Sequence, residues 1–372
     1  MKKRVLIGIP NLGICNGVTT FIMSFYDYLL NQGYAVDFLL VMDNHSELES
    51  YVLDRGSNIY MVPNYSKYDK RRVSYIDNVF YENNYDIVHV NFPGPNGAMV
   101  LKSAKKNGVK YRIYHCHNPL NVLSIKSILS EKIFTPLCKR RANKYVACTN
   151  MAGKSIFGNA KFEVINNAIN PRDFLFSEEA RVRIRKDFNI ENQLVVGVAA
   201  RMDDQKNPDF IIDVFCEIRK INPGAKLLWV GDGRKQNQIQ AICAERDIKE
   251  SVLLVGRQSN VRDWYSAMDV FLLPSKFEGL GIVYLEAQAN GLLCFGSDRV
   301  PEETEVTNLM HRISLDKTAA EWAAEILETY ESSQKKREVD IDLFKEKGYD
   351  SRFVESRLYD VYESFFENNH LD

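Results

Sequence analysis

The sequence predicts an α/β protein of two domains, each built on a doubly wound parallel sheet. Three observations predict this fold class. Short apolar segments, which suit strands buried on both faces, alternate with helix-forming segments along most of the 372 residues. Glycine-containing loops follow strands and open helices, as at Pro10–Val18. The alternation restarts after a charged helix at Glu178–Phe188, which indicates a second sheet and a domain boundary near Asn170.

The expected elements of the first domain, residues 1–170, begin with a buried strand and a helix closed by glycine. Strands are expected at Val5–Ile9, Val36–Val41, Ile59–Pro63, Tyr85–Asn91, Tyr111–Pro119 (running out into a loop) and Lys144–Asn150. Helices are expected at Thr19–Asn31, Gly97–Asn107 and Ile133–Ala142.

The second domain, residues 171–350, repeats the same alternation. Its strands are expected at Leu194–Ala200, Lys226–Gly233, Val252–Gln258, Asp269–Leu273 and Leu293–Ser297, and its helices at Gln236–Arg246, Val261–Met268 and Ala319–Tyr330. An aromatic-rich helix at Ser351–Phe366 finishes the chain.

The charge is divided unevenly along a chain of ordinary globular composition, which is 45% apolar and 26% charged. Residues 1–170 hold 21 Lys and Arg against 12 Asp and Glu, whereas the remainder holds 27 against 37. Three basic tracts, Lys67–Arg72, Lys102–Lys110 and Lys139–Lys144, suit an anionic acceptor or an anionic membrane surface. The alternative is that these tracts are solvated helix faces.

The cysteines indicate a reducing compartment. Seven cysteines occur without a Cys-x2-Cys pair, which argues against a zinc site and against a disulfide framework. The first apolar run, Val5–Ile9, is ended by Pro10 and is too short for an export signal or a membrane span. We therefore expect a cytoplasmic protein, at most peripheral on the inner face of the membrane.

The stretch Leu273–Gly291 reads as a strand, a glycine loop and a helix. A helix start preceded by glycines offers backbone N–H groups and the positive end of the helix dipole to a phosphate. Glu278 lies before the loop and Glu286 about a turn into the helix. Carboxylates beside a phosphate site more readily accept hydrogen bonds from hydroxyls, so the ligand implied is a phosphate joined to sugars.

A second motif places two cations at the end of the strand Leu194–Ala200. Arg201 and Lys206 follow this strand, and Asn-Pro then opens the next helix. Two positive charges suit a diphosphate, whose oxygens Arg can bind bidentately. The alternative is a solvated loop in which Asp203 and Asp204 pair with the cations locally.

Two histidines, His115 and His117, lie at the carboxyl end of a strand, where ligands bind in an open α/β sheet. We expect the two side chains to point to opposite sides of the extended strand, so that only one faces the ligand, and we favour His117. A zinc-binding pair is the third interpretation, but no further ligand follows nearby.

Glu278-x7-Glu286, behind Pro-Ser and around Gly-Leu-Gly, resembles the signature of the retaining glycosyltransferases of family 4. The resemblance implies the GT-B fold, in which two Rossmann-like domains face each other across a cleft and a C-terminal helix, here 351–372, crosses back to the N-terminal domain. It also implies that residues 1–170 bind the acceptor and residues 171–350 the nucleotide-sugar.

The resemblance also implies roles for individual residues. The catalytic residues would be His117 beside the donor sugar, Arg201 and Lys206 on the diphosphate, and Glu278 on donor-sugar hydroxyls. Donor binding would further involve Gly17, Arg257 near the nucleobase, the loop residues Gly279, Leu280, Gly281 and Ile282, and Glu286 on the ribose. The family has a Gly-Gly pair in the first loop where this chain has Asn16-Gly17, and a tight turn explains Gly17 equally well.

The activity implied is transfer of a hexosyl or N-acetylhexosaminyl group from a UDP-sugar to a saccharide or lipid-linked acceptor, with retention, in exopolysaccharide or capsule synthesis. Two mechanisms of retention remain open: attack by the acceptor on the same face as the leaving group, which we favour, and formation of a covalent intermediate. No cofactor, metal or nucleic acid is expected, because fixed cations and helix amides replace the metal and Asp340-Ile341-Asp342 lies in a charged segment. The alternatives are a nucleotide-sugar epimerase or hydrolase, and a non-catalytic partner of another transferase.

Overall fold

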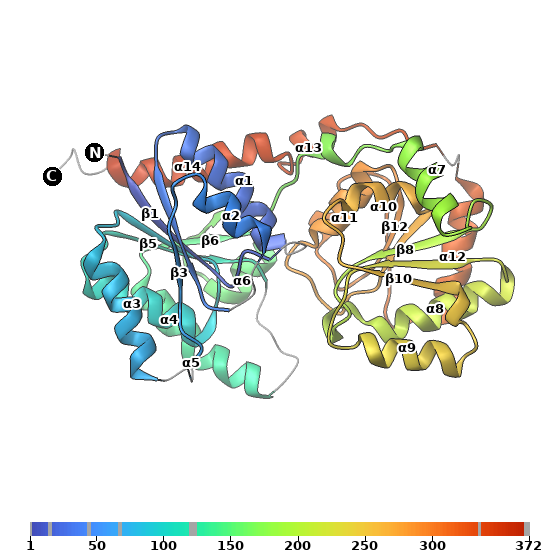
Figure 1. Cartoon of the computed structure of the whole chain (residues 1–372), viewed down its shortest axis with the longest axis horizontal. Helices are drawn as coiled ribbons and strands as arrows, with labels where there is room; N and C mark the ends of the chain where they lie inside the picture. The colour runs from blue at the N-terminus through green and yellow to red at the C-terminus, as the bar shows by residue number, and fades with distance from the viewer. Residues whose placement is uncertain are drawn as a thin grey trace. The chain divides into compact units, whose positions relative to one another are not determined.

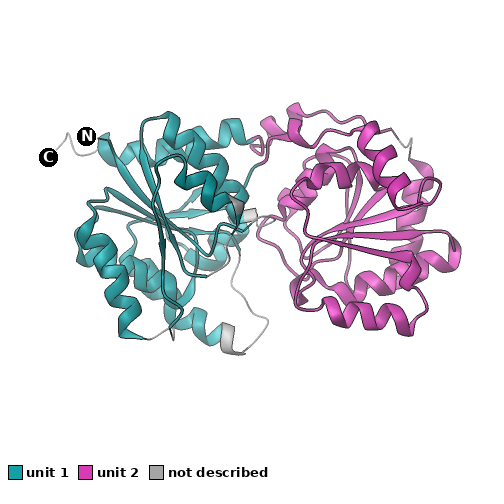
Figure 2. Cartoon of the chain, viewed as in Figure 1, with its two compact units in different colours: residues 1–168, 351–372 teal, residues 169–350 magenta. Residues whose placement is uncertain are grey.

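The computed structural model describes residues 2–13, 17–42, 46–65, 69–118, 125–333 and 336–367. Each of two units contains one parallel α/β sheet, which confirms the predicted fold class (Figure 1). Unit 1 comprises Met1–Ala168 and Ser351–Asp372, and unit 2 comprises Ile169–Asp350 (Figure 2). The units therefore separate next to Asn170.

The sheet of unit 1 changes its winding direction between its first and fourth strands. Its strands are β1 (Arg4–Ile9), β2 (Ala35–Leu40), β3 (Ile59–Met61), β4 (Ile87–Val90), β5 (Tyr111–Cys116), β6 (Lys144–Ala147) and β7 (Glu163–Val164), in the order β3-β2-β1-β4-β5-β6-β7. Connections leave β1 and β4 toward opposite faces, which opens a crevice at their carboxyl ends.

Helices cover both faces of this sheet (Figure 1). One apolar cluster joins the sheet to α1 (Gly17–Asn31), α2 (Glu47–Leu53) and α14 (Ser351–Glu367), and another joins it to α3 (Lys70–Glu82), α4 (Gly94–Lys106), α5 (Ile125–Arg141) and α6 (Asn150–Phe157). Lys3 pairs with Glu363 of α14 at 2.6 Å, and Tyr111 stacks on Phe365 with ring centroids 4.4 Å apart. The last helix therefore belongs to unit 1.

In the basic tract Lys67–Arg72, Lys70 and Arg71 are exposed, but Arg72 is not. Arg72 is buried in α3, where it donates to the carbonyls of Pro63 and Tyr65 and to Asn96. The expectation was wrong for Arg72 because α3 packs this face of the helix against the unit. Lys67 lies outside the described residues.

The sheet of unit 2 has the same kind of reversal. Its strands are β8 (Val195–Ala199), β9 (Lys226–Val230), β10 (Val252–Gly256), β11 (Val270–Leu273), β12 (Leu293–Ser297) and β13 (Met310–Ile313), in the order β10-β9-β8-β11-β12-β13. Its helices are α7 (Glu178–Asp187), α8 (Pro208–Ile221), α9 (Gln236–Glu245), α10 (Val261–Ala267), α11 (Ile282–Ala289), α12 (Ala319–Ser332) and α13 (Asp342–Glu346). The reversal lies between β8 and β11, so this is where a ligand is expected in unit 2.

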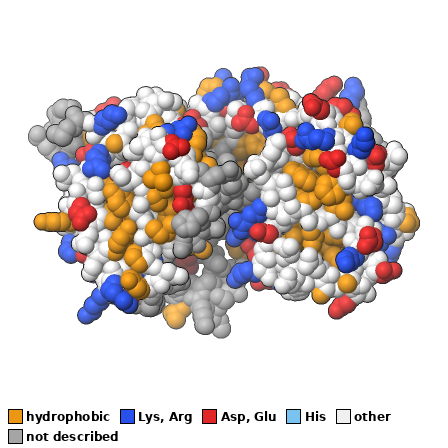
Figure 3. Space-filling view, viewed as in Figure 1, with side chains coloured by type: hydrophobic (Ala, Val, Ile, Leu, Met, Phe, Trp, Pro, Cys, Tyr) orange, Lys and Arg blue, Asp and Glu red, His pale blue; other side chains and the backbone are white. Residues whose placement is uncertain are grey.

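Unit 1 keeps a basic balance, with 23 Lys and Arg against 17 Asp and Glu, and unit 2 an acidic one, with 25 against 32. On the visible face of each unit the two signs of charge are interspersed (Figure 3). The two units therefore differ in net charge, but the visible face of neither unit carries charge of a single sign. None of the helices among the described residues has the length and apolar character needed to cross a bilayer.

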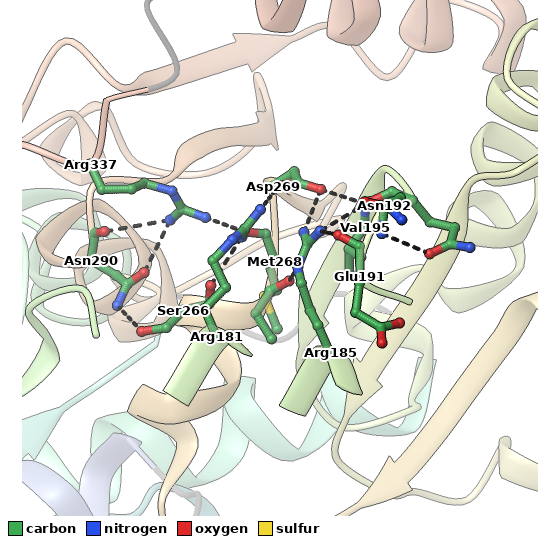
Figure 4. Close-up of polar contacts among 12 residues, drawn as sticks. Arg181, Arg185, Glu191, Asn192, Val195, Ser266, Met268, Asp269, Asn290 and Arg337 are labelled. Carbon is green, nitrogen blue, oxygen red and sulfur yellow. Dashed lines mark hydrogen bonds and ion pairs between the residues drawn. The ribbon is translucent and has the colours of Figure 1, made fainter. Parts of the chain in front are cut away.

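A cluster of arginines ties together the amino ends of the two central strands of unit 2 (Figure 4). Asp269, directly before β11, accepts from Arg181 at 2.7 Å and Arg185 at 2.6 Å, both on α7, and from the backbone N–H of Val195 at 2.8 Å. Burial raises the pKa of Asp269, but the charges of Arg185 and then Arg181 outweigh burial and hold this pKa below its usual value. Desolvation, followed by repulsion from Arg181, lowers the pKa of the neighbouring Arg337 to about 10.

Candidate active site

The candidate site of unit 2 lies where β8 and β11 end. Lys206 closes a short 3₁₀ helix, Asn207 takes a left-handed conformation with φ 58°, and Pro208 begins α8. This turn directs Lys206 toward the loop after β11, where its ammonium lies 2.5 Å from Glu278 Oε1. The side chains of Lys206 and Glu278 are 13% and 5% exposed, so two residues predicted for the site form a buried ion pair.

Further hydrogen bonds connect the loop that follows β8 with the loop that follows β11. Ser275 Oγ donates to Glu278 Oε1 at 2.6 Å, and Gln205 Nε2 donates to Glu278 Oε2 at 3.2 Å and to the carbonyl of Phe277 at 3.1 Å. A carboxylate has about four acceptor positions and an ammonium three donors. Glu278 therefore retains an acceptor position on Oε2 and Lys206 retains donors for a ligand.

The glycine loop opens α11 at this point. Gly281 is the N-cap residue with φ 78°, and a Cβ there would lie 2.7 Å from the ring of Tyr284 and 3.3 Å from Glu278 Cγ. Only glycine fits this close approach without strain. Gly279, Leu280, Gly281 and Ile282 thus lead into the helix start, whose first-turn amides and dipole favour an anion.

Glu286 lies on α11 and is held by a residue that the sequence did not indicate. Tyr265 on α10 donates its hydroxyl to Glu286 Oε2 at 2.7 Å, and both side chains are buried. Burial raises the pKa of Glu286 to about 7, with the hydrogen bond from Tyr265 acting in the opposite direction. Glu286 therefore changes its charge near neutral pH.

The two predicted arginines are more exposed than Lys206. Arg201 pairs with Asp203 at 3.3 Å with 61% of its side chain exposed, and Arg257 pairs with Asp232 at 2.8 Å. Asp204 pairs with Lys235 at 2.8 Å and not with Lys206. The alternative of local pairing in the loop thus describes Arg201 but does not describe Lys206.

His117 lies at the carboxyl end of β5 in unit 1, buried between two asparagines. Its Nε2 is 2.8 Å from Asn91 Oδ1, and its Nδ1 is 3.0 Å from the side-chain oxygen of Asn167. Asn91 also donates to the carbonyls of Gly8 and His89, which orients its oxygen toward His117. Burial lowers the pKa of His117 to about 4, although the hydrogen bond to Asn167 acts in the opposite direction, so the imidazole is neutral near pH 7. A neutral imidazole carries one N–H, so it donates to only one of these two oxygens at a time.

The expected placement of His115 was wrong. The rings of His115 and His117 are stacked with centroids 4.0 Å apart, so both side chains lie on one side of the strand. Residues two apart in an extended strand share a face, which is the physical reason. His115 is buried in a hydrogen-bonded chain with His89 at 3.0 Å and, through His89, with Tyr362 of α14 at 2.8 Å.

The zinc interpretation gains no support from the described part of the chain, which contains no group of three or more His, Cys, Asp or Glu arranged to hold a metal ion. Gly17 is the first residue of α1. Asn16, its neighbour in the predicted pair, lies outside the described residues.

The sequence analysis did not identify Asn91 and Asn167 as site residues. For Asn91 a signal was present, because Asn91 follows β4 in the same way that His117 follows β5.

Comparisons with known proteins agree with this architecture. The model described as Glycosyltransferase Family 4 matches residues 15–173, and the model described as Glycosyl transferases group 1 matches residues 180–342. A glycosyltransferase named EpsF from Bacillus subtilis is 26% identical over 99% of this chain and 98% of its own length. An Escherichia coli relative, named UDP-Gal:alpha-D-GlcNAc-diphosphoundecaprenol alpha-1,3-galactosyltransferase, is 24% identical over 80% of each chain.

Solved structures show the same fold at low identity. HepE of Anabaena, crystallised with UDP and glucose, has a TM-score of 0.80 and 15% identity over 98% of this chain and 100% of its own. WaaG, described as a glycosyltransferase of lipopolysaccharide biosynthesis, has a TM-score of 0.68 and 14% identity over 95% of each chain. With both domain models matched in the expected order, the chain belongs to the family 4 glycosyltransferases of GT-B fold.

Proposed function

We propose that this glycosyltransferase moves a hexosyl or N-acetylhexosaminyl group from a UDP-sugar to a saccharide or lipid-linked acceptor, with retention, in exopolysaccharide or capsule synthesis. The observation that carries the donor assignment is the buried Lys206–Glu278 pair beside the start of α11. The cation and the helix start suit a diphosphate, and the remaining acceptor position on Glu278 suits a sugar hydroxyl. Two relatives support this donor and acceptor class: HepE was crystallised with UDP and glucose, and the Escherichia coli relative is named for a UDP-Gal donor and a diphosphoundecaprenol-linked acceptor.

In the reaction that we favour, the acceptor oxygen bonds to the sugar C1 on the face from which UDP departs. The bond from C1 to the diphosphate breaks with its electron pair on UDP, and the acceptor proton passes to the departing phosphate oxygen. Lys206, Arg201 and the first amides of α11 stabilise the charge that develops on the diphosphate. Glu278 already accepts from Lys206, Ser275 and Gln205, which favours a positioning role over nucleophilic attack.

Product analysis tests the proposal. UDP-sugars are first screened by thermal shift, because a bound donor stabilises the folded protein by mass action. The stabilising donor is then incubated with candidate acceptors, and NMR is expected to show a new glycosidic bond with the donor's anomeric configuration. Hydrolysed or epimerised donor as the sole product, or donor binding without any transfer, would overturn it.

Changing Glu286 to glutamine is expected to weaken UDP binding and to remove a pH dependence. The carboxylate accepts ribose hydroxyls better than the protonated acid, and loss of one partner of a buried hydrogen bond costs about 1–3 kcal/mol. Because the pKa of Glu286 is about 7, the charged fraction falls roughly tenfold between pH 8 and pH 6, and the affinity of wild type should fall with it.

Isothermal titration calorimetry of UDP at pH 6, 7 and 8 measures this effect. Titration of UDP itself affects both proteins equally, so the difference between wild type and Glu286→Gln isolates the carboxylate. Parallel pH profiles for the two proteins would refute the ribose assignment.

Chelation is expected to leave turnover unchanged, because fixed cations and helix amides take the place of a metal in our proposal. The measurement is the initial rate after dialysis against EDTA, compared with the rate after Mg²⁺ or Mn²⁺ is added back. A rate that collapses with EDTA and recovers with either ion would show that the diphosphate is held through a metal.

A further inference from the structure

The two carboxylate oxygens of Glu286 have different surroundings. Oε2 accepts the hydroxyl hydrogen of Tyr265 at 2.7 Å. Oε1 has no hydrogen-bond partner among the described residues, and it is not one of their fully buried unpaired atoms, so solvent can reach it. A carboxylate oxygen accepts up to two hydrogen bonds. Oε1 can therefore accept from two neighbouring hydroxyls of a ligand, whereas Oε2 is already engaged.

Tyr265 is held firmly enough to fix the direction of its hydroxyl. The side chain is fully buried, and its ring meets two other rings edge to face. One is Phe174 at the end of the 3₁₀ helix η1 (Pro171–Phe174), with centroids 6.4 Å apart, and the other is Phe271 of β11 at 5.8 Å. A ring packed in this way can turn only a little, so the oxygen of Glu286 that it contacts is held in place as well.

The helix α10, which carries this tyrosine, is itself anchored by the arginine cluster of Figure 4. Its last carbonyls accept from two arginines of α7: Arg181 donates to those of Ser266 at 3.1 Å and Met268 at 3.0 Å, and Arg185 donates to that of Ala267 at 3.0 Å. Cations at the carboxyl end of a helix are favoured by the helix dipole. A chain of contacts therefore runs from α7 through α10 to Glu286.

Among the described residues, Tyr265 is the one titratable group whose contact shifts the pKa of Glu286, and it opposes the larger effect of burial. The elements packed against this part of α11 are α10, η1, β12 and the 3₁₀ helix η4 (Glu302–Thr304). The charged and titratable residues that these elements carry make no contribution: Arg172, Asp173, Arg262, Asp263, Cys294, Glu302 and Glu303. The hydroxyl of Tyr265 thus acts on Glu286 without competition from a neighbouring charge.

We propose that Tyr265 is a positioning residue of the donor site, which holds Glu286 by Oε2 so that Oε1 accepts the ribose hydroxyls of the nucleotide. The inference rests on the ribose assignment in the proposed function and adds the group on which that assignment depends. Tyr265 does not touch the ligand. It prevents the carboxyl group from turning and favours its charged form, which is the better acceptor.

Carbon-13 NMR of the full chain, labelled at the glutamate carboxyl carbons, tests this support without a ligand. The Glu286 signal is the one that Glu286→Gln removes, and in wild type it is expected to titrate with a midpoint of about 7. In Tyr265→Phe the midpoint should move to higher pH, because the lost hydrogen bond favoured the charged form. Tyr330→Phe, which removes a tyrosine hydroxyl on α12 of the same unit, should leave the midpoint unchanged.

Calorimetry with UDP tests the consequence for binding. Tyr265→Phe should weaken UDP roughly threefold to tenfold at pH 7, which is the size of one lost hydrogen bond, and by less at pH 8.5, where more of the carboxyl is charged. In the Glu286→Gln background the same substitution should have almost no effect, because the group that it supports is already gone. Tyr330→Phe should bind UDP like wild type.

The two measurements separate failure of this proposal from failure of the proposed function. If Glu286→Gln binds UDP as tightly as wild type, the ribose assignment fails and this proposal fails with it. If Glu286→Gln binds UDP weakly but Tyr265→Phe does not, the role of Tyr265 alone is overturned. A midpoint that Tyr265→Phe leaves at the wild-type value, or an equal loss of affinity in both backgrounds and at both pH values, would also overturn it, since either result would indicate general structural damage or no support at all.

Discussion

Lys206→Ala is expected to lower the turnover number by roughly a hundredfold or more. The ammonium is fixed at 2.5 Å from Glu278 by a left-handed Asn207 and by the clamp between the loops, so it needs no reorganisation when charge develops on the diphosphate. Loss of one such preorganised electrostatic group costs about 10²–10³ in rate in other enzymes. A loss of similar size is expected for Arg201→Ala, provided that the diphosphate draws Arg201 from Asp203.

Controls must separate chemistry from stability, because Lys206→Ala also leaves Glu278 buried without its cation. The double variant Lys206→Ala/Glu278→Gln removes the unpaired charge and should recover thermal stability but not turnover. Lys220→Ala, which breaks an exposed pair with Glu217, should leave both unchanged. Near-wild-type turnover in both Lys206→Ala and Arg201→Ala would contradict the diphosphate assignment.

Strand and helix periodicity predicted most of the fold, because buried parallel strands are short apolar runs that are easily distinguished from the helices between them. The prediction failed where an element is polar or irregular. The helix α5 begins at Ile125, eight residues before its predicted start, and continues through Pro136. Arg72 looked like a surface charge because local sequence does not reveal which face of α3 is packed.

The candidate site was predicted as positions but not as contacts. Lys206 and Glu278 were each placed by a strand end and a glycine loop, but their pairing depends on β8 and β11 being neighbours in the sheet. The contact of Tyr265 with Glu286 joins two helices across 21 residues, and no pattern in the sequence predicts it. The sequence could have placed His115 and His117 on one face, because the period of a strand already requires it.

The largest effect on stability is expected from Asp269→Ala, at the opposite end of the two strands that carry the site. Asp269 is the carboxylate that faces both Arg181 and Arg185, and it also accepts the N–H of Val195 (Figure 4). Removal of one partner from a buried ion pair costs about 3–5 kcal/mol, because the remaining charge is left uncompensated. Here two guanidinium groups lose their carboxylate while Arg337 remains beside them.

Tryptophan fluorescence during urea unfolding measures this loss for unit 2 alone, because the three tryptophans of the chain, Trp229, Trp264 and Trp322, all lie between residues 169 and 350. Asp269→Asn keeps hydrogen-bonding capacity without the charge and should lie between wild type and Asp269→Ala. Asp213→Ala, which breaks an exposed pair with Arg246, should cost less than about 1 kcal/mol.

The pH dependence of the same measurement identifies the charge as the cause. The pKa of Asp269 is depressed in the folded protein, so its contribution is complete above the unfolded value of about 3.9 and is lost as the pH falls through the lower folded value. The difference in unfolding free energy between wild type and Asp269→Ala should therefore be constant near neutral pH and shrink in acid. If Asp269→Ala unfolds at the same urea concentration as wild type at pH 7, the arginine cluster does not hold β8 and β11 in place, and the rigidity of the Lys206–Glu278 pair must come from the loops alone.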